Sequence, residues 1–374
     1  MNNSKKIAII GASYLQLPLV LKANDLGYES YCFAITEGAV CKEHCTSFYP
    51  ISILEKEEIL AICKEIRIDA VLSIASDLAV GTVNYIASEL GLIANPESST
   101  SITTHKFFMK VALQKEGVNV AQFTRCKNPQ DLEKATLFRY PIIVKPVDRS
   151  GSLGVSKIES ISELKNAFET AKNSSISGEV ILEEFIIGTE ISVESISQNG
   201  VHHILAFTDK VTTGAPHFVE LEHHQPSALL QTTQDEIKNL ITKALTVLSI
   251  ENGAAHSELI ITSNNEIFIN EIGARMGGDF IGSNLVQLST GFDYLKAVLD
   301  VSLGNPIILK FSSLKYSGVV FRNTMNEAKF DQVSRKEPYI ITLESNLKNA
   351  LKLTKSNERG NYFIYQSNKR INFD

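Results

Sequence analysis

A lysine that precedes a glycine-rich segment is the first arrangement in this chain that could bind phosphate. Lys145 closes the apolar run "YPIIVKP", and the small residues Ser150, Gly151, Ser152 and Gly154 follow it. Small residues leave backbone N–H groups accessible, and such groups attract anions. A P-loop would instead place its lysine after the glycines and at the start of a helix. The arrangement therefore predicts a phosphate site in which the lysine ends a strand and the small residues form a loop.

Two glutamates on neighbouring strands form a second candidate site. The stretch "HSELIITSNNEIFINEIGAR" reads as two alternating strands around the turn "SNN". With the turn centred between its two asparagines, Glu258 opposes Glu271 and His256 opposes Gly273. Facing like charges destabilise paired strands, and a cation between them removes that cost. Two carboxylates suit Mg²⁺, with Mn²⁺ as an alternative metal; a solvated acidic pair is the competing interpretation.

A polar segment, "TTGAPHFVELEHHQP", is the strongest candidate for recognising a substrate. Glu220 could bind an ammonium group, and His217 could help to remove a proton from an attacking amine. A solvated loop with ordinary histidines is the competing interpretation, and a transition-metal site is a weaker one. Gly277 and Gly278, in "GARMGG", are further candidates for the substrate site.

The elements that must position these residues show two different sequence patterns, one in each part of the chain. The first hundred residues alternate apolar strand runs ("KIAIIGA", "YESYCFAI", "DAVLSIAS") with amphipathic helices. This order predicts an α/β domain, a doubly wound parallel sheet with right-handed crossovers. From Lys106 onward, the runs predict an α+β region dominated by antiparallel strands, and the tail reads as short strands around one helix.

The first strand and turn, "IIGASYLQ", lack the G-x-G-x-x-G pattern of dinucleotide-binding sites. Strand ends in parallel sheets nevertheless form crevices that bind ligands. Ser13 and Asp77 follow two of these strands, so either could line a substrate pocket. For Asp77, capping of the next helix is the favoured interpretation.

Composition excludes several classes of protein. The net charge of −6 argues against a nucleic-acid surface, and the apolar runs are too short to cross a bilayer. The N-terminal run is too short for a signal-peptide core. Five cysteines fit a reducing compartment, and "CKEHC" lacks the second Cys/His pair of a zinc site. We predict a soluble, cytoplasmic protein without a membrane or nucleic-acid partner.

Taken together, the order and spacing of these motifs resemble the ATP-grasp superfamily, most closely the branch with L-amino-acid ligases and the carbamoyl-phosphate synthase domains. The resemblance implies a Rossmann-like domain over residues 1–95, a two-lobed ATP-grasp domain over 96–304, and a small C-terminal α+β subdomain over 305–374. The small lid lobe of the ATP-grasp domain would span about 106–182, and its larger antiparallel lobe 183–304.

The resemblance also implies roles for single residues. The phosphates of ATP would contact Lys106, Lys145 and the loop from Ser150 to Gly154; adenine would contact Glu183, Glu184, Phe185 and Ile186; ribose would contact Glu190; the metal would contact Glu258 and Glu271. Arg275 would steady the transferring phosphoryl group, and a structural bridge from Arg275 to Glu271 is the alternative. One position departs from the family, which often has Glu-x-Asn-x-Arg where this chain has "EIGAR". Gly273 thus replaces a third metal ligand, which makes two fully occupied Mg²⁺ positions less expected.

The function implied is ATP-dependent ligation. A carboxylate, of an amino acid or a similar small metabolite, would be phosphorylated to an acyl phosphate, and an amine would attack to give an amide, ADP and phosphate. Charge neutralisation and exclusion of water are what this chemistry needs from a protein. The alternatives are a carbamoyl-phosphate-like or purine-pathway-like enzyme with another donor or acceptor, and a nucleotide-binding protein that has lost catalysis. Relatives of this kind often form homodimers, so dimer and monomer both stay open.

Overall fold

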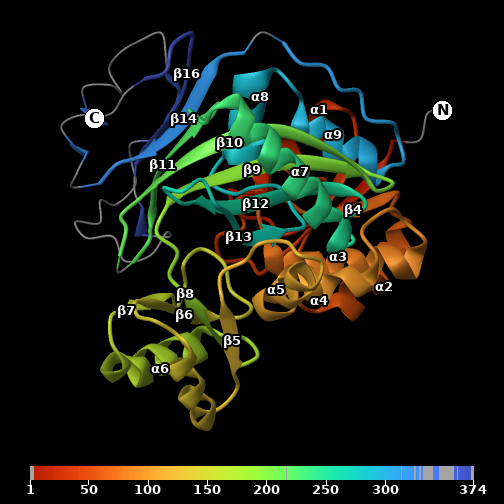
Figure 1. Ribbon diagram of the computed structural model, residues 1–374. Helices are drawn as coiled ribbons and strands as arrows, with labels where there is room; N and C mark the ends of the chain where they lie inside the picture. Colours follow the sequence, from red (N-terminus) through yellow and green to blue (C-terminus); the bar gives the residue numbers. More distant parts are fainter. Residues whose placement is uncertain are drawn as a thin grey trace.

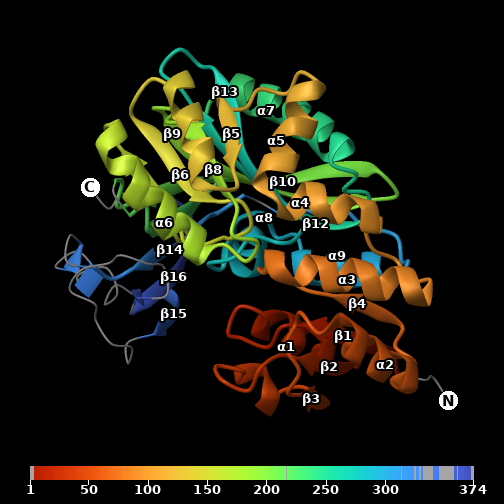
Figure 2. The same cartoon turned by 90° about the horizontal axis from the view of Figure 1, so that it is seen from below.

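Three sheets organise the residues that the computed structural model describes, namely 4–215, 217–312, 314–323, 326–327, 330–331, 340–344, 358–359 and 361–371. Figure 1 shows a small lobe with β5 to β8 below a large central sheet. Figure 2 shows the N-terminal strands β1 to β3 on the opposite side of the molecule from that lobe. The predicted combination of an α/β part and an α+β part is confirmed.

The N-terminal sheet is parallel, with the strand order β3-β2-β1-β4. Alternate residues of its central strand face opposite layers, because side chains along a strand point to opposite sides. Ile9 packs with helices α1 and α9, whereas Ile10 packs with α2 and α3. The elements are β1 (Lys6–Ile10), α1 (Leu17–Asp25), β2 (Glu29–Phe33), β3 (Ser47–Tyr49), α2 (Lys56–Ile66), β4 (Ala70–Leu72), α3 (Asp77–Leu90) and α9 (Tyr294–Ser302).

The small lobe is a four-stranded antiparallel sheet with one face covered by α6. On β6, Val144 packs under α6, so Lys145 must point to the other face. On β8, Leu182 packs under α6 in the same way and Glu183 points away from it. Because side chains alternate along each strand, Lys145 and Glu183 both point from the uncovered face. The elements are β5 (Phe123–Cys126), β6 (Ile142–Pro146), β7 (Ser156–Ile158), α6 (Leu164–Ser174) and β8 (Val180–Glu184).

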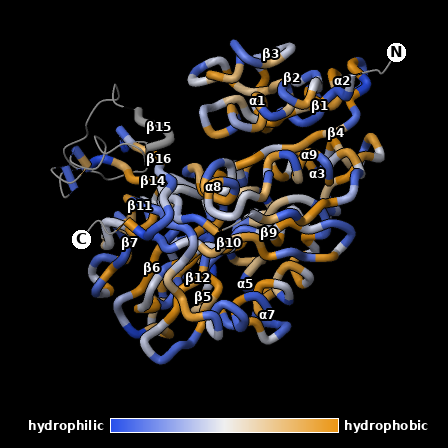
Figure 3. The backbone as a smooth tube through the Cα atoms, turned by 90° about the horizontal axis from the view of Figure 1, so that it is seen from above, coloured by the Kyte–Doolittle hydropathy of each residue, from blue (hydrophilic) through white to orange (hydrophobic). Residues whose placement is uncertain are grey.

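The large sheet is antiparallel, with the order β13-β12-β9-β10-β11-β14-β16-β15. Helices α5 and α7 pack on one face, and α9 packs between the other face and the N-terminal sheet. Along α7, apolar and polar colours alternate in Figure 3, as expected for a helix with one buried side. The elements are α4 (Thr100–Thr104), α5 (Lys106–Lys115), β9 (Thr189–Gln198), β10 (Val201–Thr212), β11 (Glu220–Gln225), α7 (Gln231–Val247), β12 (Gly253–Ile261), β13 (Ile267–Gly273), α8 (Val286–Thr290), β14 (Tyr316–Phe321), β15 (Ile340–Glu344) and β16 (Tyr362–Ser367).

The last three strands belong to the same sheet as β9 to β13. Strand β14 pairs with β11, and β16 pairs with β14. The segment after residue 304 is therefore joined to the large lobe through backbone hydrogen bonds, and the three domain limits stay a prediction. Much of the segment in which a tail helix was expected lies outside the described residues.

No helix in the described ranges combines the length and the apolar character needed to span a membrane.

Candidate active site

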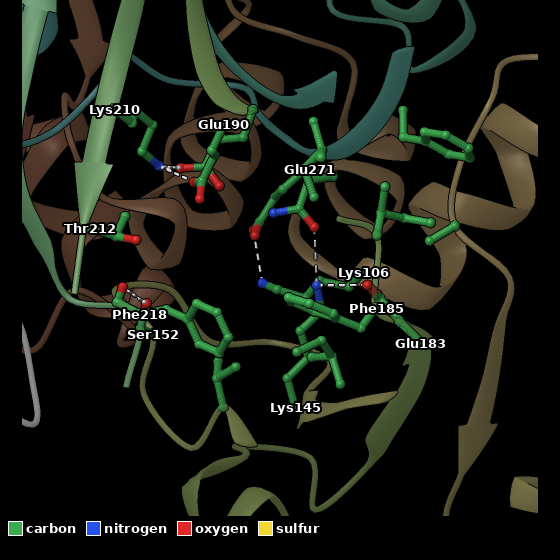
Figure 4. Close-up of a pocket in the computed structure, with 18 of the residues that line it drawn as sticks. Lys106, Lys145, Ser152, Glu183, Phe185, Glu190, Lys210, Thr212, Phe218 and Glu271 are labelled. Atoms are coloured by element: carbon green, nitrogen blue, oxygen red, sulfur yellow. Dashed lines mark hydrogen bonds and ion pairs between the residues drawn. The ribbon is translucent and has the colours of Figure 1, made fainter. Parts of the chain in front are cut away.

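A cleft of about 680 Å³ lies between the uncovered face of the small lobe and the large sheet. Figure 4 shows lysines and glutamates from both lobes pointing into it. Most of the residues predicted from the sequence line this cleft: Lys106, Lys145, Ser150, Gly151, Ser152, Glu183, Glu184, Phe185, Ile186, Glu190, Glu220, Glu258, Glu271 and Arg275. Six predicted residues are not among its lining: Ser13, Asp77, Gly154, His217, Gly277 and Gly278.

The predicted register of the carboxylate pair is confirmed at the site. Glu258 opposes Glu271, and His256 opposes Gly273. Nearer the turn the predicted register is wrong by one position, because Leu259 opposes Ile269. The turn is thus centred on a single asparagine instead of between two.

A β-bulge reconciles the two registers. The pairing shifts between Glu258 and Leu259, which leaves Asn270 as the extra residue of β13. The bulge brings Asn270 into the lining of the cleft, where its Oδ1 accepts a hydrogen bond from Lys145 Nζ at 3.4 Å. Asn270 was not predicted, since a one-residue insertion leaves no trace in the alternation of apolar residues.

Each glutamate of the pair holds one lysine. Lys210 Nζ lies 2.7 Å from Glu258 Oε1, and Lys106 Nζ lies 2.8 Å from Glu271 Oε1. Burial acts to lower the pKa of Lys106, but the nearby carboxylates, Glu271 first and then Asp77 and Glu183, together hold that pKa above its usual value. Each of the two glutamates is therefore paired with an ammonium group, one from β10 and one from α5.

Lys210, on β10, was not predicted from the sequence. Its Nζ also lies 2.7 Å from Glu190 Oε1 and 4.0 Å from Glu220 Oε1, and its side chain is 3 % exposed. Burial would lower the pKa of Lys210, but the three carboxylates raise it well above its usual value. The only available signal was a charged residue inside the strand run "ILAFTDKV".

The pair Glu258 and Glu271 fits a hard divalent cation. Burial would raise the pKa of Glu258, yet Lys210 and then His256 hold it well below its usual value, so the carboxylate is ionised. In the part of the chain that the structure describes, no group of three or more His, Cys, Asp or Glu side chains is arranged to hold a metal ion. A cation here would depend on ligand phosphates and water for its other positions, which is the usual manner of Mg²⁺.

A buried histidine, His256, links the buried Glu194 to Glu258. His256 Nδ1 lies 2.5 Å from Glu194 Oε1, and its Nε2 lies 3.4 Å from Glu258 Oε1. Burial lowers the pKa of His256, but Glu194 outweighs burial and raises the pKa to about 9. The backbone N–H of Gly277 donates to Glu194 Oε2 at 3.0 Å. Gly277, which was predicted to contact a substrate, thus restrains the glutamate that binds His256.

On the small lobe, Glu183 lies between two lysines. Its Oε2 is 2.9 Å from Lys145 Nζ and 3.4 Å from Lys110 Nζ. Glu183 Oε1 and Lys110 Nζ are buried and make no hydrogen bond within the described residues. A polar atom left without a partner is costly unless a ligand supplies one. Glu183 Oε1 is therefore available to accept a hydrogen bond from a ligand. The contact of Glu183 with adenine stays a prediction.

The lowered pKa of Lys110 predicts that nucleotide binding depends on pH. Burial lowers the pKa of Lys110 to about 8; Glu183 opposes the shift, Lys145 reinforces it, and Glu271 opposes it more weakly. The ammonium loses its charge as pH rises through that value, so the cleft that Lys110 lines becomes less positive and attracts an anionic nucleotide less strongly. We expect the affinity for MgADP to fall about fivefold between about pH 7 and about pH 9.

Isothermal titration at a series of pH values measures this effect. Lys110→Met is expected to bind MgADP more weakly at the lower pH and with a flat profile. An unchanged slope in that variant would assign the pH dependence to another group.

The glycine-rich loop is held in place at its start and at its tip. Asp148 accepts hydrogen bonds from Ser175 Oγ and from the backbone N–H groups of residues 176 and 177. At the tip, Ser152 Oγ donates to the carbonyl of Phe218 at 3.1 Å, across the cleft. Ser152 and Phe218 both have positive φ, 56° and 50°, a backbone strain that often marks functional segments.

Arg275 does not bridge to Glu271; it pairs with the N-terminal domain. Its Nε and Nη2 donate to the two oxygens of Asp77 at 2.9 and 2.8 Å. The interpretation of Asp77 as a helix cap is wrong, because Ser76 holds the N-cap position and makes no side-chain capping bond. The partner of Asp77 lies 198 positions away in the chain, a distance at which no local pattern could reveal it.

Residues 138–283, which include parts of both lobes of the cleft, match the family model described as "ATP-grasp domain". This segment of the chain is similar to an ATP-grasp domain. The match begins before Lys145 and ends beyond Arg275, so it spans the loop, the carboxylate pair and the arginine.

Curated proteins similar to this chain include ligases and a transferase. The chain is 26 % identical over 260 residues to the L-arginine-specific L-amino acid ligase of Bacillus subtilis, covering 66 % of this chain and 61 % of the relative. It is 25 % identical over 189 residues to the formate-dependent phosphoribosylglycinamide formyltransferase of Methanococcus maripaludis, covering 50 % and 49 %. The chain thus spans about half to three-fifths of the length of these relatives.

A solved structure shares the whole fold with this chain. The L-amino acid ligase from Bacillus licheniformis superposes with a TM-score of 0.83 at 22 % identity, covering 99 % of this chain and 95 % of that one.

Proposed function

We propose that this chain is an ATP-dependent carboxylate–amine ligase. The observation that carries the proposal is the facing pair Glu258 and Glu271, each with a lysine, at the floor of a cleft that Lys145 and Arg275 also line. Transfer of a phosphoryl group needs mainly positioning and neutralised charge, and these residues supply both. The location in the cytoplasm remains a prediction from the sequence, and monomer and homodimer both stay open.

Each residue has a part in the proposed reaction. Lys106 and Lys145 hold the phosphates of ATP. Glu258 and Glu271 would hold Mg²⁺, which would supply charge neutralisation for phosphoryl transfer. A carboxylate oxygen of the first substrate attacks the γ-phosphorus, the bond to the β-phosphate oxygen breaks, and ADP leaves. Arg275 stabilises the charge on the transferring group. The loop tip at Ser152 keeps water from the resulting acyl phosphate.

In the second step an amine attacks the carbonyl carbon of the acyl phosphate. The C–N bond forms, the C–O bond to phosphate breaks, and the amine loses a proton. We propose that Glu220, on the wall of the cleft, orients an ammonium group of a substrate. The L-amino acid ligase among the relatives supports amino acids as substrates. The formyltransferase among them favours a second candidate, the same activation with a different carboxylate and acceptor.

Release of ADP, screened over pairs of amino acids and related acids and amines, tests this proposal, with mass spectrometry of the products. We expect ADP formation that depends on both substrates and yields an amide. ATP binding without turnover across the whole panel would favour a nucleotide-binding protein that has lost catalysis. ADP formation with one acid and no amine product would favour another acceptor.

A further inference from the structure

The glycine at the end of β13 is not required by its backbone. Gly273 is not among the residues with positive φ, so any residue could adopt its conformation. What excludes a side chain is space. A Cβ atom at position 273 would lie 2.6 Å from Asp77 Oδ1 and 3.2 Å from Arg275 Nε. The 2.6 Å separation is shorter than real Cβ atoms show, so the Asp77 carboxylate or the strand would have to move, and the 3.2 Å separation is tight. Gly273 therefore leaves room for the ion pair of Asp77 and Arg275.

This ion pair fixes the orientation of Arg275. A guanidinium group has five N–H donors in one plane. Two of them bind Asp77, and Nη1 donates to the carbonyl of Met276 at 3.3 Å. Two donors remain for a ligand, and Arg275 lines the cleft. A bidentate contact restrains both the direction and the plane of the guanidinium, which a single hydrogen bond would not do.

Asp77 is itself held firmly by the N-terminal domain. It is the first residue of α3, where the helix dipole favours a carboxylate. The loop before it is tied to the strand end that carries Arg275, because the backbone N–H of Ala75 donates to the carbonyl of Met276 at 3.1 Å. The side chains of Asp77 and Arg275 are only 15 % and 14 % exposed, so solvent competes weakly for the pair.

We propose that Asp77 is a positioning residue that aims Arg275 at the terminal phosphoryl group of the nucleotide, and that Gly273 is the residue that admits it. The inference rests on the proposed function, because it takes Arg275 as the arginine that contacts this group. It gives the N-terminal domain a part in the reaction, since the carboxylate that orients the arginine comes from that domain.

A double-mutant cycle tests the proposal through binding, without any acid or amine. The variants are Asp77→Ala, Gly273→Ala and the double variant, and the ligands are MgADP and the magnesium complex of a non-hydrolysable ATP analogue. Each single change should weaken the triphosphate analogue about tenfold, the lower range for a hydrogen bond to a charged group, and leave MgADP within about twofold. The double variant should be no weaker than Asp77→Ala, because the added methyl group then meets no carboxylate.

Three further variants separate positioning from structure. Asp77→Asn keeps one acceptor oxygen and should lie between wild type and Asp77→Ala. Lys22→Ala breaks the ion pair between α1 and Asp293, 2.9 Å long, which joins the N-terminal domain to the start of α9. It should bind both ligands as wild type does. Arg275→Lys, which cannot make the bidentate contact, should bind like Asp77→Ala and be insensitive to a further change at residue 77.

Several results would overturn the inference: wild-type binding by Gly273→Ala, independent effects of the two single changes, or the same loss in Lys22→Ala. The proposed function can fail separately. A chain that shows this binding pattern but forms no ADP in the substrate screen would keep the positioning role and lose the ligase assignment. A chain that binds neither nucleotide would lose both.

Discussion

Glu271→Gln is expected to lower the rate of ADP formation on the order of 10³-fold. The change keeps the size of the side chain and removes its charge. It takes one of two facing carboxylates from the proposed metal position and the counter-charge from Lys106, whose Nζ lies 2.8 Å away. We expect the apparent requirement for Mg²⁺ to rise as well, which a titration of the rate with Mg²⁺ measures directly. Electron paramagnetic resonance of Mn²⁺ with ADP bound gives a readout that needs no turnover.

The same hairpin offers the matched control. Glu266, at the turn between β12 and β13, is exposed, and it contributes backbone hydrogen bonds to the turn. Glu266→Gln removes an equal charge outside the cleft and should leave the rate and the metal requirement unchanged. A rate for Glu271→Gln within tenfold of wild type, with normal Mn²⁺ binding, would contradict the role of the carboxylate pair.

Lys145→Met should lower kcat/KM for ATP by about a hundredfold or more. The substitution keeps most of the apolar stem and removes the ammonium that lies 2.9 Å from Glu183 and 3.4 Å from Asn270. We expect the loss chiefly in KM, because the lysine is proposed to hold phosphate both before and during transfer. Initial rates of ADP release over a range of ATP concentrations separate the two parameters.

Stability is the second readout for this variant. Breaking a buried ion pair costs about 3–5 kcal/mol when one charge is left alone. Glu183 keeps Lys110 at 3.4 Å, so a smaller loss is expected, with a folded protein at room temperature. Lys165→Met, on the exposed side of α6 in the same lobe, should change neither readout. An unaltered KM in Lys145→Met would place the phosphates elsewhere.

The parts of this fold that could be predicted from the sequence are those with local signals. Strands β1, β2 and β4 are apolar runs because helices cover both faces of their sheet, and such runs stand out in a sequence. Strand β3 has three residues, Ser47–Tyr49, which is too short for any periodicity. The carboxylate pair was predictable because one hairpin holds both glutamates, so a turn and an alternation sufficed.

What the sequence could not show depends on contacts between distant segments. A lysine within a helix or strand usually lies with its charge in solvent, so a position in such an element does not by itself indicate that Lys110 or Lys210 is buried. Their glutamate partners come from other elements of the fold. The register of the hairpin was right at Glu258 only because the bulge at Asn270 offset the misplaced turn. The pair of Asp77 and Arg275 joins two domains, and only the folded chain brings it together.

The pairing of β14 with β11 has a consequence for any shortened form of this protein. Residues from Glu222 to Gln225 of β11 bond to residues from Ser317 to Val320 of β14, so β11 is an interior strand. A chain cut at residue 304 would turn β11 into an open edge, with unpaired N–H and C=O groups beside Glu220. Such edges recruit strands from other molecules and promote aggregation. The C-terminal strands therefore cover an edge of β11 that would otherwise be free to pair with another chain.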